Sequence, residues 1–347
     1  MGARDTGAVA VDAPALAEGV TAGGDSGVRS ACPLCAGTDH EIVGTRDRSG
    51  APLTSALCRA CGHVYTVPRP TAQDLSAYYA LRYRQDYKSV AAPKAKHVWR
   101  AGQRAAERLL HLLNAVRPPA AVLDVGAGGG EFVYLARRAG FAARGIEPHQ
   151  GYAAHARERL GLDVANADFQ SADIAAHSCD VITLHHVLEH LPDPPAAMAR
   201  LRGWLKPAGR LIVEVPNVLS WYHAPRRRFH RAHVQSFNRT GLENLIANAG
   251  FEVIAVQLTP HTAHLNLVAR KADPPPSITW RDASAEVRDG LARHTALAHA
   301  LSGRPLRRLW ANLKRPLAER RALMRIKGAP DARAILDAIA REHGWTA

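Results

Sequence analysis

The chain has 347 residues, of which 47% are hydrophobic, and this is enough for an α/β domain with appended pieces and excludes disorder throughout. A formal net charge of +14 favours an anionic partner such as nucleic acid, a membrane surface or a phosphorylated substrate, although solvated arginine faces explain it equally well. Because neither a signal-peptide pattern nor an apolar run of about 18 residues occurs, we expect no export and no membrane span.

Residues 1–30 are rich in glycine, alanine and small polar side chains, and they predict a disordered leader. The next segment, 31–70, carries two Cys-x-x-Cys pairs. Four thiolates at this spacing can close a tetrahedral site, so the sequence predicts a structural Zn²⁺ ion; the alternative is a redox pair. The predicted ligands are Cys32, Cys35, Cys58 and Cys61.

His63 follows the second cysteine pair, but four cysteines already fill a tetrahedral site, so we expect it to be a bystander. Segments 41–46 and 52–57 predict a small hairpin between the pairs, with most of its stability supplied by the metal. Because the five cysteines do not resemble a secreted disulfide framework, the expected compartment is the reducing cytoplasm.

Residues 71–118 predict a helical linker or cap. A long amphipathic helix is expected over 95–116, ending before Pro118 and Pro119. Upstream of it, four tyrosines at near-helical spacing can either pack on the main domain, the commoner fate, or line a substrate pocket. These are Tyr78, Tyr79, Tyr83 and Tyr87.

Residues 119–272 alternate predicted strands and helices, which indicates an α/β domain with a mostly parallel sheet covered on both faces. A helix is expected over 239–249. The predicted strands are 121–125, 142–146, 163–165, 180–184, 210–215, 251–258 and 265–269. Polar motifs follow several of these strands at their carboxyl ends, the edge at which open α/β sheets bind ligands.

The strand at 121–125 ends in three glycines at alternate positions, Gly126, Gly128 and Gly130, before a helical pattern. Such a turn brings bare backbone close to a ligand at a helix N-terminus. A dinucleotide loop would carry its last glycine where Glu131 stands. Because this carboxylate and Asp124 would repel a pyrophosphate, the loop favours a cationic ligand.

Acidic residues after the second and third strands complete this pattern. Glu147 is placed to accept from both hydroxyls of an adenosine ribose. Asp168 can accept a hydrogen bond from an exocyclic amine, and Phe169 can stack on a purine. Each acid alone could instead cap a helix or sit in a solvated turn.

Together with the Val187–Pro194 run and the Leu-Lys-Pro-Ala-Gly segment, these motifs resemble the class I S-adenosylmethionine-dependent methyltransferases over about residues 120–270. The resemblance implies a Rossmann-like seven-stranded sheet with an antiparallel last strand, and S-adenosylmethionine as methyl donor. The predicted donor-binding residues are Asp124, Gly126, Gly128, Gly130, Glu147, Asp168, Phe169 and His185.

The cysteine-rich module and its sequel resemble bacterial methyltransferases that act on sugars, surface polysaccharides and natural products. Sugar C-methyltransferases of this kind carry one histidine at the position resembling His190 and a Glu-His dyad at that resembling His233. Here Ala232 replaces the glutamate, and those enzymes' further α/β domain has no counterpart, so O-methylation is favoured over C-methylation. The predicted catalytic residues are His233, His190 and His186, each with a structural role as the alternative.

The expected acceptor is a small molecule, anionic or nucleotide-linked, held by basic residues of the loop after the fifth strand. These are Arg226, Arg227, Arg228 and Arg231, for which an exposed loop is the alternative. Residues 273–347 predict a basic helical region that either grips an anionic surface or presents a solvated face. It contains one interleaved acid, Glu319, among Arg304, Arg307, Arg308, Lys314, Arg315, Arg320, Arg321, Arg325 and Lys327.

Two other functions fit parts of the sequence. An RNA base methyltransferase would explain a zinc module with strong positive charge, but the fourth strand lacks the Asn-Pro-Pro-Tyr type of run, which argues against nucleic acid as the substrate. A non-catalytic adaptor with a degenerate methyltransferase fold is disfavoured by the intact glycine loop and acids. The sequence leaves the acceptor and the oligomeric state open.

Overall fold

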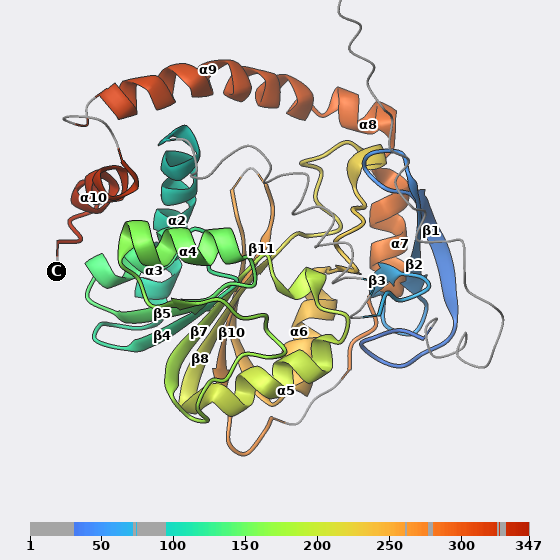
Figure 1. Ribbon diagram of the computed structural model, residues 1–347. Helices are drawn as coiled ribbons and strands as arrows, with labels where there is room; N and C mark the ends of the chain where they lie inside the picture. The colour runs from blue at the N-terminus through green and yellow to red at the C-terminus, as the bar shows by residue number, and fades with distance from the viewer. Residues whose placement is uncertain are drawn as a thin grey trace, which may run out of the picture.

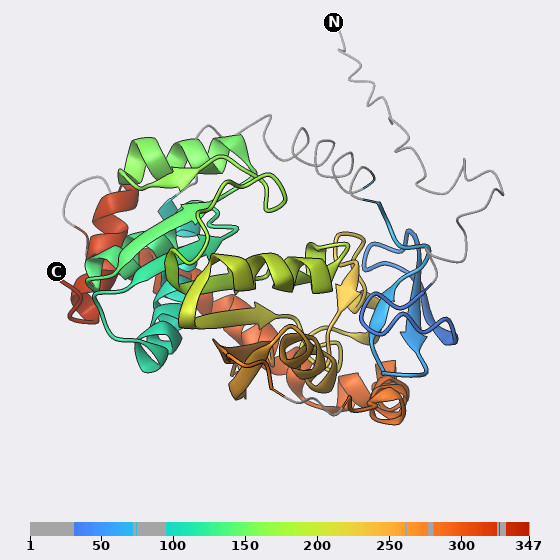
Figure 2. The same ribbon diagram turned by 90° about the horizontal axis from the view of Figure 1, so that it is seen from below.

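The protein is described by a computed structural model (Figures 1 and 2). The described residues are 31–71, 74, 95–260, 262–276, 280–324, 326 and 331–346. The expected leader lies outside them, as do Tyr78, Tyr79, Tyr83, Tyr87, Arg325 and Lys327.

A seven-stranded sheet forms the centre of the molecule, in the order β10-β11-β8-β7-β4-β5-β6. Its neighbouring strands pair in parallel except β11, which is antiparallel to both β8 and β10. The strands are β4 (Ala121–Val125), β5 (Ala142–Ile146), β6 (Val164–Ala165), β7 (Cys179–His185), β8 (Leu205–Val215), β10 (Phe251–Leu258) and β11 (Leu265–Lys271). The predicted α/β class and the antiparallel last strand are therefore confirmed, although β8 starts earlier than expected.

Helices cover both faces of this sheet (Figure 1). Within β4, Val122 points to the side of α2, α3, α4 and α10, and Leu123 points to the side of α5 and α6, as the two-residue period of a strand requires. The helices are α2 (Ala95–Ala115), α3 (Glu131–Arg138), α4 (Gln150–Leu160), α5 (Pro194–Trp204), α6 (Arg239–Asn248) and α10 (Ala332–Glu342).

A second, four-stranded sheet contains the cysteine-rich segment, in the order β1-β2-β3-β9. The predicted hairpin is confirmed as β1 (His40–Arg46) and β2 (Pro52–Cys58), and β3 (Val64–Thr66) follows it. The fourth strand, β9 (Gln235–Ser236), belongs to the loop after β8 and pairs with β3 in antiparallel register. The cysteine-rich module and the loop that follows β8 therefore share one sheet.

The C-terminal helices extend from the cysteine-rich module to the helices on one face of the central sheet (Figures 1 and 2). Val287 of α7 packs with Leu57 and Val64 of the module, whereas α9 contacts α2. The three helices before α10 are α7 (Ser284–Arg293), α8 (Ala296–Leu301) and α9 (Arg304–Met324). None of the helices in the described ranges is long and apolar enough to cross a lipid bilayer.

Candidate active site

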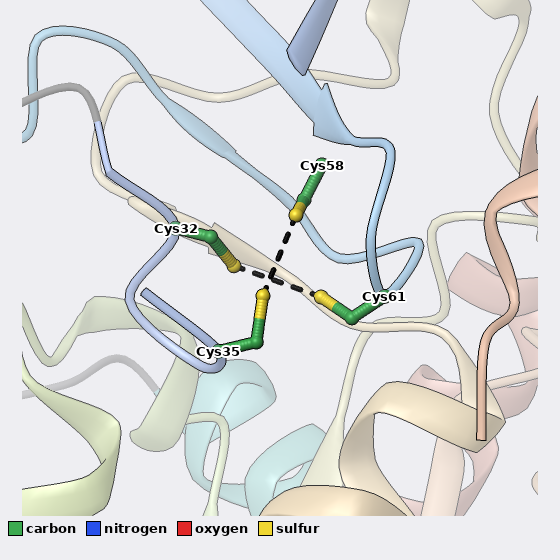
Figure 3. Close-up of side chains that lie close together, drawn as sticks. All are labelled: Cys32, Cys35, Cys58 and Cys61. Atoms are coloured by element: carbon green, nitrogen blue, oxygen red, sulfur yellow. Dashed lines mark hydrogen bonds between the residues drawn. The ribbon is translucent and has the colours of Figure 1, made fainter. Parts of the chain in front are cut away.

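The four cysteines of the two Cys-x-x-Cys pairs point toward one centre (Figure 3). Cys32 Sγ lies 3.7 Å from Cys61 Sγ, and Cys35 Sγ lies 3.5 Å from Cys58 Sγ. A tetrahedral zinc with Zn–S bonds of about 2.3 Å requires sulfur separations of about 3.8 Å. All four Sγ atoms lie within 4.8 Å of one another, so the cluster has the size and the chemistry of a closed zinc site.

His63 is buried beside the cysteines and lies outside the cluster. Its Nε2 atom lies 2.8 Å from Gln235 Oε1, and its ring stacks on Tyr65. Next to it, the Asn238 side chain donates to the carbonyl of Gly62 at 2.8 Å. These contacts fasten the module to the chain segment that follows β8.

The glycine loop adopts left-handed backbone at three positions, with φ of 75° at Gly126, 56° at Gly128 and 87° at Gly130. A Cβ on Gly126 would lie 2.6 Å from a methyl group of Val187, and one on Gly130 would lie 2.7 Å from Leu162. A Cβ on Gly128 would meet nothing within 4 Å. The middle glycine therefore presents bare backbone to open space, whereas the outer two are packed.

Glu147, directly after β5, turns its buried carboxylate toward this loop. Its Oε2 accepts from the Gly128 N–H at 2.8 Å, and its Oε1 accepts from the His149 N–H at 2.9 Å. Burial raises the pKa of Glu147. Because each carboxylate oxygen can accept a further hydrogen bond, the group can bind a ligand without losing these contacts.

Asp168 and Phe169 lie beyond the short strand β6. Asp168 Oδ1 accepts from the N–H groups of Gln170 and Ser171, at 2.7 and 3.0 Å, so it caps a turn. The Phe169 ring meets Trp204 edge-on, with centroids 5.4 Å apart. Both side chains thus have structural partners, and their binding roles stay predictions.

Three consecutive residues at the end of β7 connect the glycine loop to a second site. His185 Nδ1 lies 3.3 Å from Asp124 Oδ1, just before the loop. Val187 packs on Gly126. Between them His186, with φ of 59°, lines a separate cavity.

His186 lies between two carboxylates. Its Nε2 is 2.7 Å from Glu214 Oε1, and its Nδ1 is 3.2 Å from Glu189 Oε1. Although burial opposes the charged form, these two partners raise the pKa of His186 to about 9. At neutral pH the side chain is therefore an imidazolium that donates from both nitrogens.

Glu214, near the end of β8, is shared by several basic groups. Arg108 of α2 donates to both carboxylate oxygens at 3.1 Å, and His264 Nδ1 lies 3.5 Å from Oε1. Although burial acts in the opposite direction, the bonds from His186, His264 and Arg108 hold the pKa of Glu214 well below its usual range. The carboxylate is consequently charged at neutral pH.

The other two predicted catalytic histidines are in contact with each other. The His190 and His233 rings meet edge-on with centroids 4.9 Å apart, and His190 Nδ1 donates to the Ala232 carbonyl at 2.8 Å. Burial lowers the pKa of His233 to about 3. His233 is therefore neutral at physiological pH, and Ala232 contributes through its backbone although it lacks a carboxylate.

Glu189 supplies a carboxylate to this group from the short helix η1 (Leu188–His190), which also contains His190. One of its oxygens and a ring nitrogen of each of His190 and His233 lie within 4.8 Å of one another. Although burial acts against it, the hydrogen bond from His186 and the nearby histidines lower the pKa of Glu189 to about 2. One buried carboxylate thus faces three histidines.

A cavity of about 200 Å³ lies where these groups meet. His186, His233 and His264 line one part of it. The turn between β1 and β2 and the loop after β8 complete its wall with Arg48, Tyr222, His223, Arg227, Arg228 and His230.

The four arginines predicted to hold the acceptor divide into two groups. Arg227 and Arg228 line the cavity, and their role in holding an acceptor stays a prediction. Arg231 instead donates to the Pro52 carbonyl at 3.0 Å, and neither it nor Arg226 is among the lining residues. The loop turns between these positions, so neighbours in the sequence point to different surroundings.

Three charged residues of this region were not identified from the sequence as site residues. Glu189 lay inside the Val-Leu-Glu-His run, and Glu214 lay next to the end of a predicted strand, the edge at which ligands bind. These two positions were the sequence features from which a functional role could have been predicted. Arg48 carried no signal, because its hairpin reaches the cavity through contacts with the distant loop after β8, among them the pairing of β3 with β9.

Comparison with known proteins agrees with the fold. A family described as "Methyltransferase domain" matches residues 98–256. The ubiquinone biosynthesis O-methyltransferase of Actinobacillus pleuropneumoniae is 38% identical over 106 residues, covering 28% of this chain and 45% of the relative. That of Coxiella burnetii is 29% identical over 123 residues, covering 31% and 53%. The chain thus spans about half the length of these curated relatives.

Among solved structures, the Burkholderia thailandensis 1,6-didemethyltoxoflavin-N1-methyltransferase, with bound S-adenosylhomocysteine, is 22% identical. The match covers 61% of this chain and 96% of that one, with a TM-score of 0.44. The family match covers the glycine loop, Glu147 and the β4–β8 part of the sheet. The match at residues 98–256 and the order of the central sheet together identify this part of the chain as a class I S-adenosylmethionine-dependent methyltransferase domain.

Proposed function

We propose that this protein transfers the methyl group of S-adenosylmethionine to a hydroxyl oxygen of a small anionic metabolite. The cavity of about 200 Å³ beside the glycine loop is the observation that supports this most directly. His185 contacts Asp124, just before the glycine loop, and Val187 packs on Gly126. His186, between them, lines the cavity. A donor on the loop and an acceptor in the cavity would therefore meet at the carboxyl edge of β7.

The donor would lie over the glycine loop. Glu147 is in position to accept from ribose hydroxyls, since its carboxylate already faces Gly128. Asp168 has a second carboxylate oxygen for the adenine amine, because its cap uses Oδ1. Asp124, held by the Thr183 hydroxyl at 2.7 Å, would place negative charge behind a cationic ligand.

Bound S-adenosylmethionine supplies a methyl carbon made electrophilic by the sulfonium, whose sulfur keeps the bonding electron pair on transfer. The protein must orient the acceptor oxygen and receive its proton. His233 is placed to receive it, because its neutral ring lines the cavity and the nearby Glu189 carboxylate favours the protonated form. His190 would orient His233, since their rings are in contact.

His186 has a different role in this proposal. Because its pKa is raised to about 9, it cannot act as a base at neutral pH. As a fixed imidazolium it would stabilise negative charge that develops on the acceptor oxygen. We therefore assign it to electrostatic stabilisation and leave proton transfer to His233.

Three arginines favour an anionic acceptor. Arg48, Arg227 and Arg228 line the cavity. The Nε of Arg228 is buried and has no hydrogen-bond partner among the described residues. A carboxylate or phosphate of the acceptor would supply one. Burial lowers the pKa of Arg228 to about 10, which still leaves it charged at neutral pH.

We further propose that the four cysteines hold a structural zinc ion. All four positions of a tetrahedron are filled by protein sulfur, so no site is left for substrate or water. The metal would stabilise the hairpin that carries Arg48 into the cavity.

Methyl transfer to a panel of hydroxylated sugar nucleotides, carboxylic acids and their neutral analogues tests the proposal, with product structures from mass spectrometry and NMR. We expect O-methylated product from anionic acceptors and a loss of roughly 100-fold or more in kcat for His233→Gln, in the range of a missing general base. Failure of the zinc-loaded protein to bind S-adenosylmethionine would overturn the methyltransferase assignment. A product methylated at a carbon atom, or transfer of the methyl group to RNA, would overturn the proposed class of acceptor.

A further inference from the structure

Helix α9 exposes an apolar stripe on its outer side. We call the outer stripe the five large side chains that recur at helical spacing and are between 54% and 64% exposed. They are Leu306, Leu309, Trp310, Leu313 and Leu317. Side chains of this size are ordinarily buried, and a contiguous exposed row of them marks an interaction site.

The inner side of α9 is fixed to the protein by polar contacts. Glu319 is buried and binds the Arg100 guanidinium of α2, with Nη2 to Oε2 at 2.7 Å. Arg308 lies over the Tyr222 ring at 4.9 Å and contacts His223 Nδ1 at 3.1 Å. Arg308 and Glu319 are eleven residues apart, about three helical turns, so they share one face.

These contacts determine where the outer stripe points. Leu313 lies between Arg308 and Glu319 in sequence and about 120–140° away from both around the helix. The stripe therefore faces away from the protein. Figure 1 shows α9 along one border of the molecule, with α2 and the sheet on a single side of it.

Basic side chains flank the stripe. Helix α9 contains seven arginines and lysines and one acid, and this acid is the buried Glu319. The exposed flanking residues include Arg307, Lys314 and Arg321. A second copy of α9 on the same stripe would bring like charges together, which disfavours a dimer through this helix. Nucleic acid would match the charge but not the exposed leucines.

We propose that α9 docks the protein on the surface of an anionic lipid bilayer. The helix would lie in the plane of the interface, with the outer stripe among the acyl chains and the basic residues at the headgroups. Trp310 suits this depth, because an indole has an apolar body and one N–H that can reach polar groups. This docking surface is distinct from the proposed methyl-transfer site and does not depend on it.

Helix α9 also contacts residues that line the candidate acceptor cavity. Tyr222 and His223, which Arg308 contacts, both line the candidate acceptor cavity. Helix α9 would therefore lie between a bilayer bound at the outer stripe and the wall of that cavity.

Flotation of the full-length, zinc-loaded protein with vesicles tests the proposal. We expect binding to phosphatidylcholine vesicles that contain about a third phosphatidylglycerol, roughly tenfold weaker binding to pure phosphatidylcholine, and loss of binding as salt rises toward about 0.5 M, because salt screens surface charges. Leu309→Glu with Leu313→Glu should reduce binding roughly tenfold or more, since both remove apolar area from the interface. The matched control is Ile254→Glu, an exposed isoleucine on β10, which should bind as the unmodified protein does.

A second variant tests the charge separately and alters no apolar residue. Lys314→Glu with Arg321→Glu should abolish the preference for anionic vesicles, and it keeps the test informative if the leucine variant fails to fold. Equal binding to neutral and anionic vesicles, or no binding, would overturn the proposal. So would a dimer in analytical ultracentrifugation that the leucine substitutions dissociate, or binding to single-stranded RNA in preference to vesicles.

Discussion

Glu147 is the residue on which donor binding depends most directly in the proposed site. Its two oxygens accept from Gly128 and His149, so the carboxylate is already oriented before any ligand binds. Such an arrangement lowers the entropy lost on binding. It requires burial of a charge, which is why the pKa of Glu147 is raised.

Glu147→Gln should weaken S-adenosylmethionine binding roughly tenfold or more, which corresponds to about 1.4 kcal/mol. The amide replaces one charged acceptor by an N–H group, which opposes either the Gly128 or the His149 N–H. Titration calorimetry measures the dissociation constant. Glu158→Gln, on an exposed position of α4, is the control and should bind normally. Unchanged affinity in the Glu147 variant would remove this residue from the donor site.

His186 makes a prediction about the pH dependence of activity. Because its pKa in the folded protein is about 9, kcat/KM should fall as the pH rises through about 9 and the imidazolium loses its proton. His186→Gln should be slower at pH 7 and should lack this alkaline decline. His97→Gln, at an exposed position of α2, is the control. A decline that persists unchanged in His186→Gln would assign it to another group.

The raised pKa of His186 also makes the stability of the protein depend on pH. Its folded pKa is raised above the unfolded value of 6.5, so its contribution is complete below about pH 6.5 and is lost as the pH rises through about 9. His233 behaves in the opposite sense: its pKa is lowered to about 3, so its contribution is present above pH 6.5 and is lost as the pH falls toward 3. Thermal unfolding across this pH range should therefore give the highest midpoint near neutral pH.

At the scale of elements, the pairing of β3 with β9 joins the cysteine-rich module to the loop that forms the cavity. The module is small, and a metal would supply much of its folding free energy. The β1–β2 turn also carries Arg48 to the cavity wall, where its backbone N–H donates to the Phe229 carbonyl at 2.8 Å. Loss of the metal should therefore weaken acceptor binding more than donor binding.

Metal analysis should find zinc bound to the protein, and Cys58→Ser should lose it. In that variant we expect the KM for the acceptor to rise roughly tenfold or more and the donor dissociation constant to change less than about twofold, because the metal stabilises only the module. Cys179→Ala, at the cysteine outside the cluster, is the control and should retain zinc.

Arg48→Ala is the companion variant, because it separates the metal from the side chain that the module positions. It should raise the acceptor KM while keeping its zinc, since Arg48 is not a ligand. If zinc loss weakens donor binding and leaves acceptor binding intact, the proposed link between the module and the cavity is wrong.

At the scale of the whole molecule, the C-terminal helix α10 completes one of the two cores that flank the central sheet. Leu336 and Ile339 are buried with residues of α2, α3 and the sheet. A Cβ on Gly102 of α2 would lie 2.6 Å from the Ile339 side chain, so the two helices are in close contact. The region predicted as a basic extension is thus partly structural.

Leu336→Ala should lower the free energy of unfolding by about 2–5 kcal/mol, because it leaves a cavity in a fully buried position. Leu313→Ala, on the exposed outer stripe, should change it by less than about 0.5 kcal/mol. Chemical denaturation followed by circular dichroism gives both values. Equal values for the two variants would mean that α10 is not part of the cooperative core.

Local spacing was enough to predict the features that a few neighbouring residues control. Strand β4 and its glycine loop, the cysteine pairs and the alternation of strands and helices all follow from it, because backbone conformation and metal geometry restrict which residues stand at which interval. The donor-site acids could be proposed as well, since parallel strands end at one edge of a sheet.

Which distant groups meet became clear only from the folded chain. The contacts of Glu189 with His233, of Glu214 with Arg108, and of the β1–β2 turn with the cavity join segments far apart in the chain. The direction of the outer stripe on α9 depends likewise on Glu319 reaching Arg100, 219 positions away. Such long-range pairings depend on packing and charge across the whole fold, and no local spacing encodes them.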